Sequence, residues 1–228
     1  MALILSLESS TSVCSVAVHL DGKLLDSEFI SEARASSTRL MVSARNLLDR
    51  NSIMPNQVTA LAVSSGPGSY TGLRIATSAA KGFCYALNVP LIVVNSLLVL
   101  SYPVVKEQES DLYCPMLDAR RSEVYCVILN GSLEFVTKVE AHVLTTGSFE
   151  NELEQNTITF FGDGSEKFSK MVNHPHAIFV DGVQPNAKNL GYLAFDKYVK
   201  SEFESVELFE PFYLKDFMVK KASNKLGV

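Results

Sequence analysis

No stretch of the 228-residue sequence is long and apolar enough to cross a bilayer, which takes about 18 to 20 consecutive apolar residues. The longest apolar stretch, residues 89–100, is interrupted by Asn95 and Ser96 and is typical of a buried strand that runs into a helix. The first residues, MALILSLESST, have no basic segment ahead of their short apolar run, so they predict a buried strand rather than a signal peptide. We therefore expect a cytoplasmic protein that does not contact a membrane.

Cysteine and histidine are both scarce, and neither forms a ligand-like motif. The four cysteines contain no CxxC pair, which favours small buried side chains over disulfides or a metal site. Only two histidines lie close together, on either side of Pro175 in an expected surface loop, where solvated side chains are the simpler interpretation. The residues are Cys14, Cys84, Cys114, Cys126, His19, His142, His174 and His176. The sequence thus predicts no metal ion and no cofactor.

The net charge is −5 and the isoelectric point is about 5.4, which disfavours direct binding of nucleic acid by the chain as a whole. The one basic cluster lies near the end of the chain and is typical of a solvated tail; its members are Lys215, Lys220, Lys221 and Lys225. A function that involves nucleic acid is then expected to depend on a partner or on a local basic patch.

The first hundred residues predict a meander of strands followed by alternating helices and strands. Asp21-Gly22 is a strong signal for a hairpin turn, and helical spacing begins after Ser36. The expected strands are residues 3–7, 13–20, 23–29, 59–63 and 91–94, and the expected helices are 36–50, 73–87 and 96–105. A hairpin-linked meander before the first crossover helix is typical of the actin-like, ribonuclease H-like (ASKHA) α/β fold.

The charged stretch at residues 106–111 divides the chain into two expected subdomains, residues 1–105 and a smaller one at 106–228. The second part repeats the order of a meander followed by helices, so we expect two similar subdomains. Its strands are expected at 112–117, 123–129, 133–139, 157–161 and 177–180, and its helices at 145–153, 166–172 and 186–200. The last helix is amphipathic and can pack back on the first subdomain.

The segment SSGPGSYTG, residues 64–72, joins an expected strand to an expected helix. Gly66, Gly68 and Gly72 allow left-handed turns and close backbone approach, and Ser69 and Thr71 stand where the helix presents free N–H groups. Such a loop can bind an anion, although it matches neither GxxxxGK[ST] nor GxGxxG. A structural strand-to-helix turn explains the same glycines, and both interpretations stay open.

The helix that follows has an unusually small side, formed by Ala76, Ala79, Ala80, Gly82 and Ala86. Small residues let two helices approach closely, either in the core of one domain or between two chains. From the residues alone, core packing is the simpler interpretation.

Four segments, in order along nearly the whole chain, resemble the TsaB (YeaZ) family. GPGSYTGLRIATSAAKG, residues 66–82, is similar to the family's GPGSFTGLRIG signature, and LILSLESSTSVCSVAV, residues 3–18, resembles its first two strands. LDARRSEVY, residues 117–125, and EPFYLKDFMVKK, residues 210–221, resemble its later segments. The resemblance implies an actin-like fold and a scaffolding subunit that performs no chemistry itself.

The resemblance also implies partners. The family binds its catalytic paralogue TsaD, which transfers threonylcarbamoyl to N6 of adenosine 37 in tRNAs reading codons that begin with adenine, and it recruits TsaE. Without TsaD it forms a homodimer, and tRNA is reached only indirectly. The contact is expected through the helices over 36–50 and 72–87, with Leu40, Ala44, Leu47, Leu48, Ile75, Ala76, Ala79 and Phe83 at the interface.

In catalytic relatives, two histidines on the first helix hold a metal ion. The positions here are Ser36 and Leu40, which cannot replace imidazole ligands. Glu8, at the end of the first strand, stands where the family has Asp. Together with Ser9, Ser10, Thr11 and the glycine segment it is a candidate for a vestigial nucleotide or anion loop, with capping of the turn at residues 9–12 as the structural alternative.

Two further features allow both a structural and a functional interpretation. Asp118, Arg120, Arg121 and Glu123 form either an ion-pair network or a contact for a nucleotide or the partner assembly. The GDG sequence at residues 162–164 matches a family turn. Alternative functions are an ATP-dependent enzyme of the same fold, which needs a magnesium site and two phosphate loops, and a glycoprotease, for which no Ser-His-Asp arrangement is evident.

Overall fold

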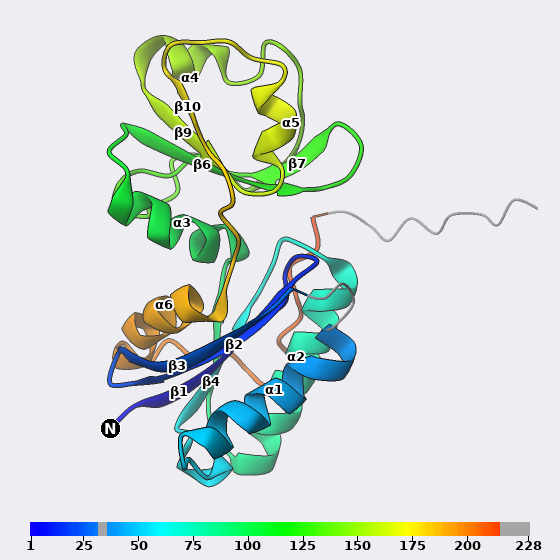
Figure 1. The fold of residues 1–228 in the computed structure, drawn as a ribbon, viewed down its shortest axis with the longest axis vertical. Helices are drawn as coiled ribbons and strands as arrows, with labels where there is room; N and C mark the ends of the chain where they lie inside the picture. The colour runs from blue at the N-terminus through cyan, green and yellow to red at the C-terminus, as the bar shows by residue number, and fades with distance from the viewer. Residues whose placement is uncertain (32–35, 215–228) are drawn as a thin grey trace, which may run out of the picture.

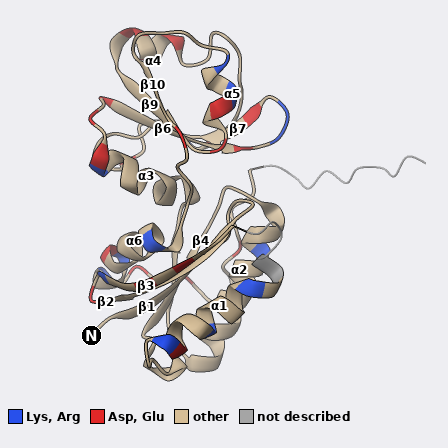
Figure 2. Cartoon of the chain, in the orientation of Figure 1, with Lys and Arg blue, Asp and Glu red and all other residues tan. Residues whose placement is uncertain are grey.

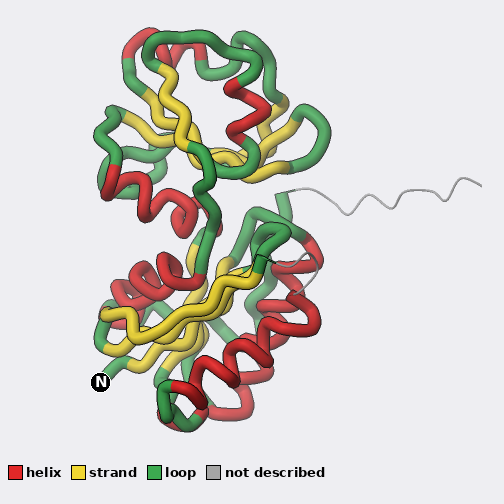
Figure 3. The backbone as a smooth tube through the Cα atoms, in the orientation of Figure 1, coloured by secondary structure: helices red, strands yellow, loops and turns green. Residues whose placement is uncertain are grey.

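The computed structural model describes residues 1–31 and 36–214, without the side chains of residues 36 and 37. Figure 1 shows two lobes, one above the other, each built around its own sheet, and Figure 3 shows helices flanking the strands in both lobes. The basic cluster of Lys215, Lys220, Lys221 and Lys225 lies outside the described residues. Among the described residues, no helix has the length and apolar character needed to cross a membrane.

The sheet of the first lobe has the order β3-β2-β1-β4-β5. Antiparallel pairing joins β1 to β2 and β2 to β3, and parallel pairing joins β1 to β4 and β4 to β5. The bounds are β1 Leu3–Glu8, β2 Cys14–Leu20, β3 Lys23–Ile30, β4 Ala60–Ser64 and β5 Leu91–Val94. The expected turn at Asp21-Gly22 is present, and both of its residues have positive φ.

The sheet of the second lobe repeats this topology. Read from its other edge, its order is β8-β7-β6-β9-β10, with β7 antiparallel to β6 and β8, and β9 parallel to β6 and β10. The bounds are β6 Leu112–Asp118, β7 Glu123–Cys126, β8 Glu140–Val143, β9 Ile158–Phe161 and β10 Ala177–Val180. The predicted actin-like fold with two similar subdomains is therefore confirmed.

Helices cover the outer face of each sheet. In the first lobe, α1, Ser36–Arg50, and α2, Tyr70–Leu87, pack side by side against β2 and β4, with a short 3₁₀ turn, Pro55–Gln57, between α1 and β4. In the second lobe, α4, Glu150–Gln155, and α5, Ser165–Ser169, lie on the corresponding face. The cysteines are free and buried in these two cores, as expected.

The remaining two helices are exchanged between the lobes. The helix α3, Ser96–Glu107, follows β5 of the first sheet but packs against β6 of the second. Conversely, α6, Ala187–Val199, follows β10 and packs against β1 and β2. Figure 1 shows both helices between the lobes, where they also contact each other.

Small residues let α6 lie close to the first sheet. Ala60 and Ala62 on β4 meet Leu190 and Ala194 of α6 in one buried cluster. Beside them His19 is fully buried, with its ring 4.9 Å from that of Tyr192, and neither ring nitrogen has a hydrogen-bond partner among the described residues. This face of the first sheet is therefore a tightly packed contact with a helix that belongs, in sequence, to the second half.

The prediction of a strand at residues 133–139 is wrong. Leu133 has a φ of 62°, which interrupts an extended run, and only an isolated bridge between Leu129 and Phe135 remains. The third strand of the second meander is instead β8, and β7 ends at Cys126 rather than continuing to residue 129. Val127, Ile128 and Leu129 are buried without forming a regular strand, whereas Phe135 and Val136 are exposed. Periodicity does not distinguish such a segment from a strand.

Candidate functional site

The glycine loop between β4 and α2 packs directly on the turn that follows β1. A Cβ atom at Gly68 would lie 2.2 Å from the carbonyl oxygen of Ser10, and one at Gly72 would lie 2.0 Å from that of Ser9. The Ser69 N–H donates to the Ser10 carbonyl at 2.6 Å. Side chains at residues 68 and 72 would thus collide with the backbone of the neighbouring turn, so close packing accounts for both glycines.

Gly66 meets a third part of the chain. Its φ is 102°, and a Cβ atom there would lie 2.7 Å from the carbonyl oxygen of Phe212. The Phe212 N–H donates to Ser65 at 2.7 Å, and the Tyr213 ring packs 4.9 Å from that of Tyr70 at the start of α2. We call residues 203–214 the C-terminal strap, because this segment runs along the first lobe from β5 to the glycine loop.

Two further contacts fix the strap along its length. The Glu204 N–H donates to the Leu91 carbonyl at 2.9 Å, next to the edge strand β5. The Lys81 ammonium on α2 donates to the carbonyl oxygens of Glu207 at 2.9 Å and Phe209 at 3.1 Å. The strap therefore ties the glycine loop, α2 and β5 together.

Glu8 is enclosed in this arrangement. Its carboxylate is 1% exposed, accepts the Ser10 N–H at 2.6 Å and accepts a hydrogen bond from the Ser64 hydroxyl. Burial raises the pKa of Glu8 above its ordinary value. The hydrogen bonds are those of a turn cap, which is the structural alternative that the sequence left open.

The structure brings together most of the candidate anion loop. The Ser9 hydroxyl donates to the Gly72 carbonyl at 2.7 Å, the Ser10 carbonyl accepts the Ser69 N–H, and Glu8 is hydrogen-bonded to Ser10 on the same turn. Gly68 packs against Ser10, while Thr71 on α2 is exposed. The two turns are so close that even a Cβ atom at residue 68 or 72 would collide with a carbonyl oxygen of the facing turn, which leaves no room for a phosphate between them. The space in which the glycine spacing would place an anion is thus filled by the chain itself.

Five of the eight expected partner-contact residues are in the core instead, so that expectation is wrong for them. Each is at most 2% exposed and packs against the first sheet: Leu40, Ala44, Leu47, Leu48 and Ala76. Ile75, Ala79 and Phe83 are half-buried against the same cluster. The residues were chosen by their helical apolar spacing, and this spacing identifies the side of a helix that packs against the rest of its own chain.

The opposite side of α2 is open. Its exposed residues Arg74, Ser78, Gly82, Tyr85 and Ala86 form what we call the outer face of α2. Tyr85 is 83% exposed, and a Cβ atom at Gly82 would have no atom within 4 Å. On the neighbouring helix α1, Met41 and Val42 are also exposed. Residues at helical spacing on the side opposite the apolar positions, such as Arg74, Ser78 and Gly82, would have identified this surface from the sequence.

The second lobe carries the charged cluster at the turn between β6 and β7, where Figure 2 shows blue and red segments on the loop beside β7. Lys167 on α5 pairs with Asp118 at 2.5 Å and donates to the Arg121 carbonyl at 2.8 Å. Arg120 and Arg121 have φ values of 69° and 54°, and neither guanidinium forms an ion pair with a described residue. The aspartate thus joins an ion pair, whereas the two arginines are exposed in a conformation that disfavours them.

The GDG turn supports this hairpin. Asp163 accepts the Asp118 N–H at 2.8 Å, and burial raises the pKa of Asp163. A Cβ atom at Gly162 would lie 2.4 Å from the Met116 carbonyl. In both lobes, then, a glycine turn packs against the backbone of the neighbouring strand or of the turn that follows it. In the first lobe the glycine turn follows β4 and packs on the turn after β1, and in the second it follows β9 and packs on β6.

One arrangement was not expected from the sequence. The imidazole of His142 lies 2.8 Å from Glu140 and 3.0 Å from the Ser148 hydroxyl, the order of groups in a serine hydrolase triad. Ser148 is only 6% exposed, and its hydroxyl oxygen accepts the Thr145 N–H at 2.9 Å. The serine therefore caps a turn and is not presented to a substrate.

The two residues expected at the metal-ligand positions of catalytic relatives, Ser36 and Leu40, are on α1. Leu40 is a core residue, and the side chain of Ser36 lies outside the described residues. No group of three histidine, cysteine, aspartate or glutamate side chains gathers within the part of the chain that the structure describes.

Comparison with known proteins identifies the family. The family model for TsaD, tRNA N6-adenosine threonylcarbamoyltransferase, matches residues 24–223. The tRNA threonylcarbamoyladenosine biosynthesis protein TsaB of Haemophilus influenzae is 25% identical over 222 residues, covering 93% of each chain. The chain belongs to the TsaD family and, within it, to the TsaB (YeaZ) proteins.

Other relatives agree with this assignment. The TsaB protein of Bacillus subtilis is 27% identical over 173 residues, covering 74% of each chain. A solved structure from Pseudomonas aeruginosa, described as similar to the peptidase YeaZ, is 28% identical with a TM-score of 0.84 over 94% of this chain and all of its own. An activator of 2-hydroxyisocaproyl-CoA dehydratase from Clostridium difficile is 10% identical with a TM-score of 0.51 over 88% of this chain and 97% of its own, which supports the shared fold alone.

Proposed function

We propose that the chain acts in threonylcarbamoyladenosine (t6A) biosynthesis as a non-catalytic scaffolding subunit in the cytoplasm. In this role it is required for the transfer of threonylcarbamoyl to N6 of adenosine 37 in tRNAs that read codons beginning with adenine. Its membership in the TsaB (YeaZ) proteins supports the pathway, because its relatives from Haemophilus influenzae and Bacillus subtilis carry that biosynthetic name. The partners are TsaD, which binds directly, and TsaE, which joins the pair.

The observation that carries the proposal is the outer face of α2. Gly82 lies at the middle of this exposed face with open space above it, so a partner helix can approach the backbone of α2 closely. Tyr85, Met41 and Val42 add exposed apolar area beside it. In the absence of TsaD the same face serves a homodimer, and tRNA contacts the complex through the partner.

The glycine loop and Glu8 support a role without chemistry of its own. The carboxylate that would position a metal ion and a phosphate in an enzyme of this fold is used in a buried turn cap. The loop that would hold the phosphate packs on Ser9, Ser10 and Phe212. These contacts favour a scaffold over an ATP-dependent enzyme.

A substitution at Gly82 tests the proposal. Gly82→Arg places a long side chain on the outer face of α2 where nothing obstructs it, and it replaces a poor helix former by a good one. We expect the variant to fold with at least the stability of the wild type and to lose binding to the TsaD of the same organism. The matched control is Gly131→Arg, which is equally unobstructed but lies in the second lobe.

Complex formation is measured by size-exclusion chromatography with light scattering, and transfer is measured on tRNA with TsaD and TsaE present. The proposal predicts that transfer requires the chain and that Gly131→Arg supports it as well as the wild type does. It is wrong if the wild-type chain forms no complex with TsaD, or if transfer proceeds equally well without the chain. Tight binding of ATP and Mg²⁺ by the isolated chain would favour the enzyme instead.

A further inference from the structure

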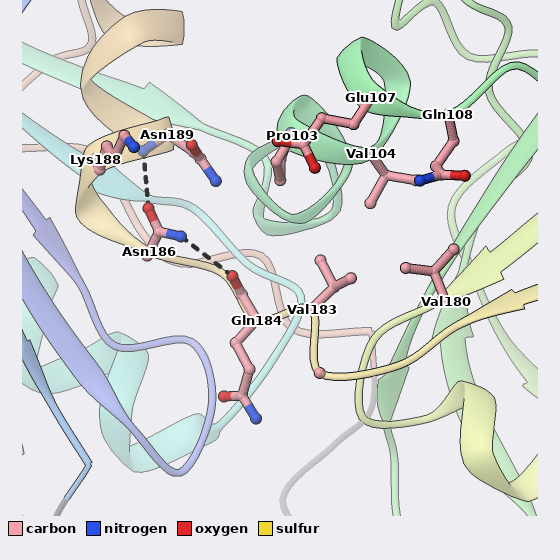
Figure 4. A pocket seen from close by; sticks show the side chains of 11 residues that line it. Pro103, Val104, Glu107, Gln108, Val180, Val183, Gln184, Asn186, Lys188 and Asn189 are labelled. Carbon is pink, nitrogen blue, oxygen red and sulfur yellow. Dashed lines mark hydrogen bonds between the residues drawn. The ribbon is translucent and has the colours of Figure 1, made fainter.

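A cavity of about 290 Å³ opens where the two lobes are joined. Figure 4 shows it between α3, α6 and the segment that leads from β10 into α6. Its walls contain four apolar side chains, two on α3, one at the end of β10 and one on the connecting segment: Pro103, Val104, Val180 and Val183. This volume is at the lower end of the range for pockets that enclose small molecules.

Asn189 points into the cavity without a partner. The residue is 6% exposed, and its position is fixed because its N–H donates to the Asn186 side chain at 3.0 Å. Its side-chain amide forms no hydrogen bond with any described residue, and Figure 4 shows it extending from α6 toward α3. The side-chain oxygen of Gln184, which also lines the cavity, is buried and has no hydrogen-bond partner among the described residues. A buried polar atom without a partner costs about 1 to 3 kcal/mol relative to a paired one, so a ligand that supplies a partner is favoured.

Charged groups of opposite sign lie on the two sides of the cavity. Glu107 is at the end of α3, and Lys188 is in the first turn of α6. Both are exposed, and neither forms an ion pair with another residue that the structure describes. A ligand that spans the cavity therefore meets a carboxylate on one side and an ammonium group on the other.

We propose that this cavity binds a free α-amino acid with an apolar side chain. The ammonium group of the ligand lies toward Glu107, and its carboxylate lies toward Lys188 and the Asn189 amide. The apolar side chain fills the space among Val104, Val180 and Val183. A zwitterion fits because it satisfies both charges and the unpaired amide together.

The location gives the ligand a defined structural effect. The helices α3 and α6 are the two that cross between the lobes, and they contact each other beside the cavity. A molecule held between Glu107 and Lys188 would connect them and stabilise one relative placement of the lobes. The site is separate from the outer face of α2, so this inference does not depend on the proposed partner.

Calorimetry with the full chain tests the inference. The ligands are the free amino acids valine, leucine and isoleucine, with valinamide and N-acetylvaline as analogues that lack one of the two charges. We expect saturable binding of at least one free amino acid at millimolar concentration or below, and weaker binding of both analogues. The inference is overturned if no free amino acid binds, or if N-acetylvaline binds as tightly as valine.

Three variants assign the binding to this cavity. Glu107→Gln and Lys188→Gln should each weaken binding by about tenfold, since a hydrogen bond to a charged group is lost while the exposed positions leave folding intact. Lys200→Gln, at the other end of α6, is the matched control and should bind like the wild type. Unchanged affinity in both Glu107→Gln and Lys188→Gln would place the ligand elsewhere and reject the site.

Discussion

The imidazole ring of His19 lies directly against Gly191, so that a methyl group at residue 191 would stand 2.2 Å from two atoms of the ring. This contact joins β2 of the first sheet to α6, the helix that follows the second sheet. The two residues are distant in sequence, yet each requires the other: a large ring fits beside the helix only where the helix has no side chain.

Gly191→Ala should therefore destabilise the protein. Overpacking against the ring costs about 1 to 3 kcal/mol, which exceeds the gain of about 1 kcal/mol from a better helix former. Gly82→Ala is the matched control, because its helix position is open and it should stabilise by up to about 1 kcal/mol. Chemical denaturation measures both, and equal effects of the two substitutions would contradict the packing seen at Gly191.

His19 should also make stability depend on pH. Burial lowers its pKa from 6.5 to about 4. Between these two pKa values the unfolded chain binds a proton at His19 that the folded chain does not. The contribution of the neutral His19 to the free energy of unfolding is therefore fully present above pH 6.5 and is lost as the pH falls from 6.5 to about 4. The loss amounts to about 3 kcal/mol and does not grow further at lower pH.

Two measurements check this dependence. NMR titration should show the His19 ring changing its protonation near pH 4 rather than near 6.5. Denaturation across the same range should show a shallower slope in His19→Gln than in the wild type. The effect of His19 is read from the difference in slope between the wild type and His19→Gln, because Glu8 also makes stability depend on pH. Burial raises the pKa of Glu8, so its contribution to the free energy of unfolding falls as the pH rises above 4.5, opposite to that of His19. A ring that titrates at 6.5 would refute the expectation.

The turn between β6 and β7 should tolerate asparagine better than the residues it has. Arg120 and Arg121 are both left-handed, a conformation that costs about 1 kcal/mol or more for such side chains and less for asparagine. We expect the Arg120→Asn, Arg121→Asn double variant to be about 1 kcal/mol more stable than the wild type. Thermal and chemical denaturation measure the change, with the exposed Lys138→Asn, Lys200→Asn double variant as a control for the loss of two positive charges. A double variant that is no more stable than this control would contradict the strain.

Lys81 should hold the C-terminal strap in place. Lys81→Met keeps much of the side-chain volume and removes the donor to the carbonyl oxygens of Glu207 and Phe209. We expect faster hydrogen exchange at the amides of Glu204 and Phe212, whose bonds to Leu91 and Ser65 anchor the two ends of the strap. The amides of β1 serve as the internal control. Unchanged exchange at both strap amides would show that the strap is held without the ammonium group.

The sequence predicts those elements whose cause is local. Asp21-Gly22 specifies a turn through its own backbone preference, and the apolar spacing of Leu40, Ala44 and Leu47 predicts the helix that the structure has at Ser36–Arg50. By contrast, α4 is confined to residues 150–155 and α5 to 165–169, both shorter than predicted, because few buried contacts determine their ends. Periodicity identifies the buried side of a helix but does not identify which sheet covers it.

The candidate site was predictable only in part for a related reason. The glycines of the loop were identified correctly as positions of close approach, but what approaches them is Ser9, Ser10 and Phe212. Phe212 is distant in sequence, and no local pattern indicates that it returns to the loop. On the outer face of α2, Gly82 and Ala86 were identified among the small residues of the helix, but Arg74, Ser78 and Tyr85 were missed because exposed residues follow no apolar spacing.

The exchange of α3 and α6 also determines when the protein can become compact during synthesis. The face of the first sheet that carries Ile4, Ala60 and Ala62 is covered by Leu190 and Ala194, which the ribosome adds long after the strands themselves. Until that helix emerges, the nascent first lobe exposes an apolar sheet surface, which is the kind of surface that chaperones bind. Premature termination anywhere between β5 and α6 would therefore leave this apolar face of the first sheet exposed, although all five strands of the sheet had been made.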